Sequence, residues 1–124
     1  MNLTASDVKV FVPALDFAKS LEFYQALGWQ LNWQAPDGLA ELELAGQRFY
    51  LQDYYNKDWA ENFMLHITVE DAKAWWKHAA KVIADGSYDN VKLREPKVED
   101  YGALVTHLID PSGVLLHFAQ FLPS

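Results

Sequence analysis

The chain contains no cysteine and no long apolar run, and each absence excludes a class of protein. Without cysteine it can form neither disulfides nor thiolate metal sites, and it has no cysteine nucleophile. No apolar run approaches the length of about 18 residues that a membrane-spanning helix needs, so we expect no membrane partner. The first residues lack the basic and apolar segments of a signal peptide. We therefore expect a cytoplasmic protein.

Positive charge is also scarce. The chain has 10 lysine and arginine residues against 17 acidic ones, which gives a formal net charge of −7. No two basic residues are adjacent in the sequence. Because nucleic-acid binding depends on clustered positive charge, we expect no nucleic-acid partner. An acidic surface maintains solubility, and it also raises the encounter rate with a cationic small molecule.

Apolar residues, in contrast, are abundant and follow regular patterns. They make up 51% of the 124 residues, which is enough for one packed domain. Valines alternate over residues 7–13 and predict a strand. Asp16 is then placed as a helix N-cap, apolar residues recur at helical spacing, and Gly28 stands at the C-cap position. Three short extended runs, separated by turn residues, follow at 29–34, 39–45 and 48–55.

The second half repeats this order. A predicted strand at 63–69 precedes a helical stripe over 70–86, and three further extended runs follow. We therefore predict an α+β fold of two βαβββ modules, about 7–55 and 63–121, joined by a linker over 56–62 in one domain of residues 1–124. Each module leaves one sheet face to cover. We expect the modules to share a core or to pair with another chain, and to enclose a cleft.

Two stretches also carry a family resemblance. "FVPALDFAKSLEFYQALGW" and "LIDPSGVLLHFAQ" resemble the opening module and the closing hairpin of the glyoxalase, bleomycin-resistance and ring-cleaving dioxygenase superfamily, also called vicinal oxygen chelate proteins. The resemblance covers nearly the whole chain and implies the same paired βαβββ fold. In the enzymes of this superfamily, His, Gln or Glu side chains on the first, fourth, fifth and eighth strands bind one divalent metal.

The corresponding positions in this chain are poor in metal ligands. They hold Lys9, Gln52, Met64 and His117, with Asp53 as an alternative to Gln52. A lysine ammonium repels a divalent cation, and a thioether is a poor ligand for hard or borderline metals. We therefore expect no cofactor.

An alternative set of ligands lies further along the fifth strand. His66 has the same strand parity as the methionine at the family position, so His66, His117 and Asp53 could form a shifted triad. Such a triad would hold one divalent metal such as Zn, Ni, Mn or Fe. The protein would then be a metal-dependent lyase, isomerase or dioxygenase. A third alternative is a module that binds a partner protein and whose cleft is filled by its own side chains.

The metal-free members of the superfamily are similar to this chain in length and acidic balance. These bleomycin-resistance proteins are exchanged-arm homodimers that sequester a bulky, cationic, aromatic antibiotic in their clefts. The resemblance therefore implies a homodimer that binds an aromatic molecule and catalyses no reaction. The molecule can carry a positive charge. The residues expected to line the cleft are Lys9, Tyr50, Gln52, Tyr54, Trp59, Met64, His66, Tyr101 and His117.

Strand alternation makes finer predictions for individual side chains. It places Trp29 and Trp33 on one face of their strand, and it groups Tyr50 and Tyr54 with the cleft. A lysine in the cleft needs a partner, for which Gln52, Asp53 or an anionic ligand are the candidates. His107 is expected to be a core or turn-bracing residue, separate in role from the second histidine of its hairpin.

Overall fold

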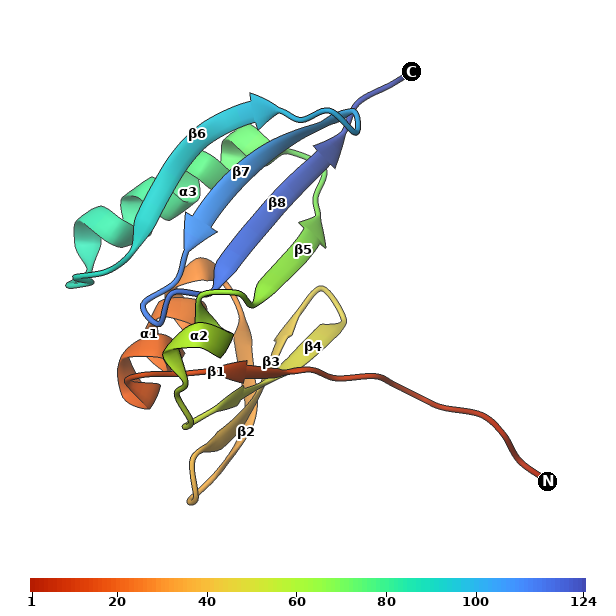
Figure 1. Ribbon diagram of the computed structural model, residues 1–124, viewed down its shortest axis with the longest axis vertical. Helices are drawn as coiled ribbons and strands as arrows, with labels where there is room; N and C mark the ends of the chain where they lie inside the picture. The colour runs from red at the N-terminus through yellow and green to blue at the C-terminus, as the bar shows by residue number, and fades with distance from the viewer.

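The computed structural model describes residues 1–124 and contains two four-stranded sheets with three helices (Figure 1). The first module comprises β1 (Phe11–Pro13), α1 (Phe17–Leu27), β2 (Gln30–Ala35), β3 (Leu39–Leu44) and β4 (Gln47–Gln52). The short helix α2 (Lys57–Ala60) follows. The second module comprises β5 (Met64–Thr68), α3 (Ala72–Asp85), β6 (Lys92–Val98), β7 (Ala103–Ile109) and β8 (Leu115–Phe121).

The two sheets have the same topology. Their strand orders are β1-β4-β3-β2 and β5-β8-β7-β6. In each sheet the first strand pairs in parallel with the last, and the other pairs are antiparallel. The predicted α+β fold of two βαβββ modules is therefore confirmed.

Helix α1 begins and ends where its capping residues predict. The Asp16 carboxylate accepts a hydrogen bond from the backbone N–H of Lys19 at 3.1 Å, which satisfies one of the free donors of the first turn. Gly28 ends the helix in the left-handed conformation with φ 118°. The caps fix the helix so that Phe23, Tyr24 and Leu27 are buried.

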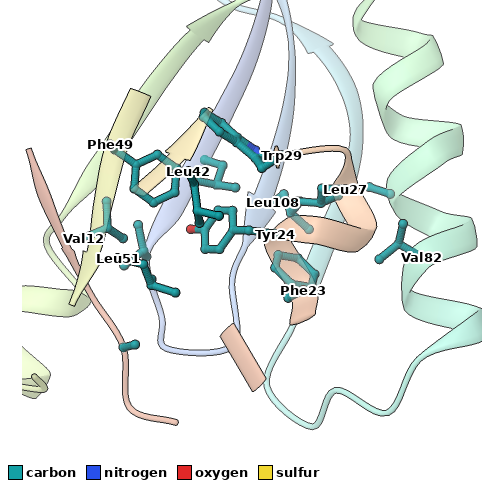
Figure 2. Close-up of a cluster of buried hydrophobic side chains, with 14 of the residues drawn as sticks. Val12, Phe23, Tyr24, Leu27, Trp29, Leu42, Phe49, Leu51, Val82 and Leu108 are labelled. Carbon is teal, nitrogen blue, oxygen red and sulfur yellow. The ribbon is translucent and has the colours of Figure 1, made fainter. Parts of the chain in front are cut away.

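One hydrophobic core joins the two modules. Figure 2 shows side chains of α1 packed among those of β1, β3, β4, α3 and β7. Tyr24 lies at the centre, with its ring 5.2 Å from that of Phe49. Polar contacts cross the same junction, because the Ser112 hydroxyl accepts a hydrogen bond from Leu15 N at 2.8 Å and lies 3.1 Å from the Ser20 hydroxyl. The turn between β7 and β8 is therefore tied to the first module.

The first strand is shorter than its valine pattern predicts. Residues 7–13 were expected to be extended and paired, but β1 starts only at Phe11. The preceding segment runs away from the body of the protein (Figure 1). Val12 is fully buried, whereas Val8 is 83% exposed, so the alternation extends beyond the part of the segment that packs on the sheet. None of the three helices has the length and apolar character required to cross a membrane.

A β-bulge overturns the prediction that Trp29 and Trp33 share a face. The register between β2 and β3 shifts between Leu31 and Trp33. The extra residue reverses the alternation beyond it. Trp29 is consequently buried, whereas Trp33 is 42% exposed on the opposite side.

The segment between the modules contains a helix that the sequence interpretation missed. The Asn56 side chain caps α2 by accepting a hydrogen bond from Trp59 N at 3.0 Å. Asparagine is a preferred N-cap, so this signal was present in the sequence.

Candidate functional site

Three histidines lie in one row across the second sheet. His66 on β5 is the register partner of His117 on β8, which is in turn the partner of His107 on β7. The rings of His66 and His117 stack with centroids 5.7 Å apart, and those of His107 and His117 meet edge to face at 4.9 Å. Strand pairing alone therefore brings three imidazoles onto the same face.

Side chains from both ends of the sheet complete this histidine face, defined here as Met64, His66, Tyr101, His107 and His117. The Tyr101 hydroxyl lies 3.2 Å from His66 Nε2. The Met64 sulfur lies 3.5 Å from His117 Nε2. The Nε2 atom of His107 lies 3.6 Å from a Glu99 carboxylate oxygen.

Burial and mutual repulsion favour the neutral form of two of these imidazoles. Burial lowers the pKa of His107, Arg94 and Lys97 lower it further, and Glu99 opposes the shift. Burial also lowers the pKa of His117, and the neighbouring His107 and His66 add to this effect. The histidine face is therefore less positively charged at neutral pH than its composition indicates.

The corresponding face of the first sheet is aromatic. We define the aromatic face as Phe11, Trp33 and Tyr50, which lie on three different strands. The Tyr50 ring centroid lies 5.1 Å from that of Phe11 and 5.7 Å from that of Trp33. Phe11 is 44% exposed, so this face offers ring surface to a ligand.

Lys9 stands beside this aromatic face, but its partners are not those expected. Its ammonium lies 2.7 Å from Asp7 and 3.8 Å from Glu41, and 5.5 Å from the centre of the Tyr50 ring. The hydrogen bond between Lys9 and Asp7 raises the pKa of Lys9 and lowers that of Asp7. The register of β3 on β4 brings Glu41 opposite Tyr50 and so within reach of the lysine. The predicted partners Gln52 and Asp53 make no such contact.

The remaining first-module residues of the predicted cleft lie at or beyond the end of β4. Gln52 is the last residue of that strand and stays half-buried. Tyr54 does not continue the strand, contrary to its predicted grouping with Tyr50. Its ring packs against Trp59 at 5.8 Å, and Trp59 in turn lies 5.8 Å from Phe63. The predicted cleft residues therefore fall into three sets: one on the histidine face, one at or beside the aromatic face, and one at or beyond the end of β4.

The largest groove lies between the two modules. It has a volume of about 610 Å³. The segments that line it are Val10, Trp29, residues 44–45 and 47–49, residues 65–70, and Trp75. Arg48, which follows the parity of Tyr50, and His66 of the histidine face both border it. The groove therefore reaches the histidine face at His66, whereas the three residues of the aromatic face and most of the predicted cleft residues lie outside it.

The alternative metal triad is not assembled. Asp53 follows the last residue of β4, and its backbone N–H donates a hydrogen bond to the Gly38 carbonyl at 2.8 Å, within the first module. No group of three or more His, Asp or Glu side chains is arranged to hold a metal ion. The imidazoles of His66 and His117 are stacked, and their Nε2 atoms lie beside different partners, the Tyr101 hydroxyl and the Met64 sulfur. The residues present do not fit the metal site of the superfamily enzymes.

The family follows from the comparison of this sequence with family models. Residues 8–118 match the model of the Glyoxalase/Bleomycin resistance protein/Dioxygenase superfamily. The chain belongs to this superfamily. The resemblance seen in the sequence is thereby confirmed. No match was found among curated proteins.

Several solved structures have the same fold. A bleomycin-binding protein complexed with bleomycin superposes with a TM-score of 0.78 at 20% identity, covering 95% of this chain and 100% of that chain. The bleomycin-binding protein from bleomycin-producing Streptomyces verticillus, complexed with copper(II)-bleomycin, gives 0.77 at 17% identity, with coverages of 96% and 100%. An antibiotic binding protein from Streptomyces sp. CB03234 gives 0.75 at 19% identity, with coverages of 98% and 100%.

Some members of the two faces escaped the sequence interpretation. His107 was expected to have a structural role apart from His117, yet the two rings are neighbours. Counting the hairpin register outward from the Asp110 turn places His107 opposite His117 on the neighbouring antiparallel strand, so this contact could have been predicted from the sequence. No sequence signal marked the bulge that turns Trp33 to the aromatic face.

Proposed function

We propose that this protein binds a bulky aromatic small molecule, such as a bleomycin-like antibiotic, in clefts of a homodimer and without a metal. The aromatic face and the histidine face supply ring surface and a few polar atoms, which is the usual composition of a small-molecule site. The observation that carries the proposal is that both faces stay open in the single chain. Met64 is 60% exposed and Tyr101 is 53% exposed.

We propose that a second copy of the chain packs against these two faces. Contiguous exposed apolar surface of this kind marks a binding or interaction site. The segment before β1 adds further exposed apolar residues, among them Leu3 and Val8. It runs away from the body of the protein, and only its last part is tied to the chain, by Asp7 and Lys9. We propose that this arm packs on the partner and that each cleft combines the aromatic face of one copy with the histidine face of the other.

The solved relatives support a binding role without fixing the ligand. Three of them are described as bleomycin-binding or antibiotic binding proteins. Identities of 20% and below support a shared fold, and the ligand of this chain therefore needs its own test. Sequestration, a cytoplasmic location and the module boundaries predicted from the sequence remain parts of the same proposal.

The expected positive charge of the ligand receives less support from the structure. The carboxylates beside the aromatic face are already paired, because Asp7 and Glu41 face Lys9, and Glu43 lies 2.9 Å from Arg48. A cation would have to meet carboxylates elsewhere, such as Asp58 on α2, which forms no ion pair. The aromatic character of the ligand is thus better founded than its charge.

A thermal-shift screen combined with sedimentation velocity tests the proposal. Bleomycin and a panel of neutral and cationic aromatic molecules should include compounds that raise the melting temperature, since a ligand at a hundredfold its dissociation constant adds about 2.7 kcal/mol of stability. Sedimentation should show a dimer. A monomer, or a panel without any stabilising compound, would contradict the proposal.

A further inference from the structure

Strand β6 carries positive side chains on the same face as the histidines. Lys92 lies opposite Ile109, Arg94 opposite His107, and Lys97 opposite Val105. Residues opposite one another on neighbouring strands point to the same side of the sheet. Three cations therefore border the histidine face along the outer edge of the second sheet.

These three cations have no partners within the chain. All the close ion pairs involve other side chains. No side-chain hydrogen bond is donated by Lys92, Arg94 or Lys97 either. The chain has only 10 lysine and arginine residues and a formal net charge of −7. Three unpaired cations on one face of a single strand of 7 residues therefore contrast with the net negative charge of the chain.

A groove of about 470 Å³ lies beside two of these cations. It is lined by Lys92, Leu93, Arg94, His107, Ile109 and Leu115. Apolar side chains provide part of its surface, and an ammonium and a guanidinium provide its charge. His107 also leaves its buried Nδ1 atom without a hydrogen-bond partner. The groove thus combines apolar surface with two cations that form no ion pair and an unsatisfied polar atom, while the Glu99 carboxylate lies beside the other nitrogen of His107.

We propose that this groove is an anion subsite for the carboxylate of a small organic acid whose apolar body packs against Ile109 and Leu115. Arg94 binds the carboxylate through the paired N–H groups of its guanidinium, a geometry that an ammonium cannot reproduce. Lys92 contributes a second positive charge. The subsite goes beyond the proposed function, because it can be occupied whether or not the two sheet faces bind an aromatic antibiotic.

Three naphthalene derivatives with matched apolar bodies test the preference for an anion. Binding of 2-naphthoate, 2-naphthylmethanol and 2-naphthylmethylamine to the full chain is measured by calorimetry at low salt, where charge interactions are least screened. The carboxylate should bind at least about tenfold more tightly than the alcohol and the amine, as expected when one charge-assisted contact is gained. Equal affinity for the three compounds would overturn the proposal.

A pair of double variants tests the position of the site. Lys92→Gln with Arg94→Gln should weaken naphthoate binding by about ten- to hundredfold. The control Lys73→Gln with Lys77→Gln removes the same charge from exposed positions on α3 and should change affinity less than about twofold, which is the expected effect of a distant screened charge. Equal losses in both double variants would show a nonspecific charge effect and would overturn the proposal.

A conservative variant keeps the test valid if the double variant folds poorly. Arg94→Lys preserves the charge but removes the planar fork, so it should retain the fold and bind naphthoate with intermediate affinity. Unchanged affinity in this variant would contradict the role given to the guanidinium. If an aromatic antibiotic binds to the chain but naphthoate does not, the subsite alone fails. If naphthoate binds and neither bleomycin nor any neutral or cationic compound of the aromatic panel does, the proposed function alone fails.

Discussion

The hydroxyl of Tyr24 in the first module donates a hydrogen bond to the carboxylate of Asp110 in the second, with the oxygens 2.6 Å apart. Both groups are buried. The other carboxylate oxygen of Asp110 accepts from the backbone N–H groups of Ser112 and Val114. Burial raises the pKa of Asp110, and these hydrogen bonds oppose the shift. One side chain thus shapes the turn of "DPSG" and joins it to helix α1.

We expect Tyr24→Phe to destabilise the protein by about 1–3 kcal/mol, because it leaves a buried acceptor without its donor. Urea denaturation measures the change. Tyr88→Phe is the matched control, since its ring packs on Phe23 at 5.1 Å and its hydroxyl forms no hydrogen bond within the chain. Equal stability of the two variants would show that the bond contributes nothing to the junction.

The histidine face predicts that the protein loses stability in mild acid. The pKa values of His107 and His117 are lowered in the folded state, and Arg94, Lys97, Glu99 and His66 are the charged or titratable neighbours that modify them. Below the ordinary histidine pKa of about 6.5, the unfolded chain therefore binds more protons than the folded one. The histidines should therefore leave the free energy of unfolding undiminished above this pH and should lower it as the pH falls from about 6.5 towards 5.

Denaturation with urea across this pH range measures the effect. The double variant His107→Gln with His117→Gln should lose most of the decrease, because glutamine does not titrate. A wild-type protein whose stability stayed constant or rose on acidification would contradict the assigned direction of both pKa shifts.

The bulge in β2 predicts opposite outcomes for two tryptophans that are four positions apart. Trp29→Ala should cost about 3–5 kcal/mol, because the indole is buried and its ring lies 4.8 Å from that of Phe49. Trp33→Ala should cost about 1 kcal/mol or less, since Trp33 is largely a surface residue. Thermal or urea unfolding distinguishes them. Similar losses would place both rings in the core and contradict the bulge.

Local sequence signals predicted most of the fold. Caps such as Asp16 and Gly28 act on their own helix, and the alternation of Phe49 with Tyr50 follows from strand geometry, so both can be seen in a short window. The valine alternation over residues 7–13 predicts a strand that is real but starts later, because alternation indicates a strand only where a neighbouring strand pairs with it. Val12 is paired and buried, whereas Val8 is exposed. The bulge at Trp33 is a property of two strands in register, and the sequence of one strand does not specify it.

The candidate site was less predictable because it depends on pairing between distant segments. Family positions directed attention to Lys9, Met64 and His117, but not to the partners that surround them. Glu41 reaches Lys9 through the register of β3 on β4. The row of histidines arises from two strand pairings at once. Such contacts join residues far apart in the chain, and single-strand parity cannot supply them.

In the proposed dimer, one ligand contacts both the aromatic face and the histidine face. Calorimetric titration with bleomycin, or with the best compound of the screen, tests it most directly when the wild type is compared with Tyr50→Ser and His117→Ala. Lys73→Gln, on the exposed surface of α3, is the control. We predict one ligand bound per chain, with an affinity that falls about tenfold or more in both face variants and stays unchanged in the control. An affinity that does not change in one of the two face variants would show that no ligand bridges the two faces.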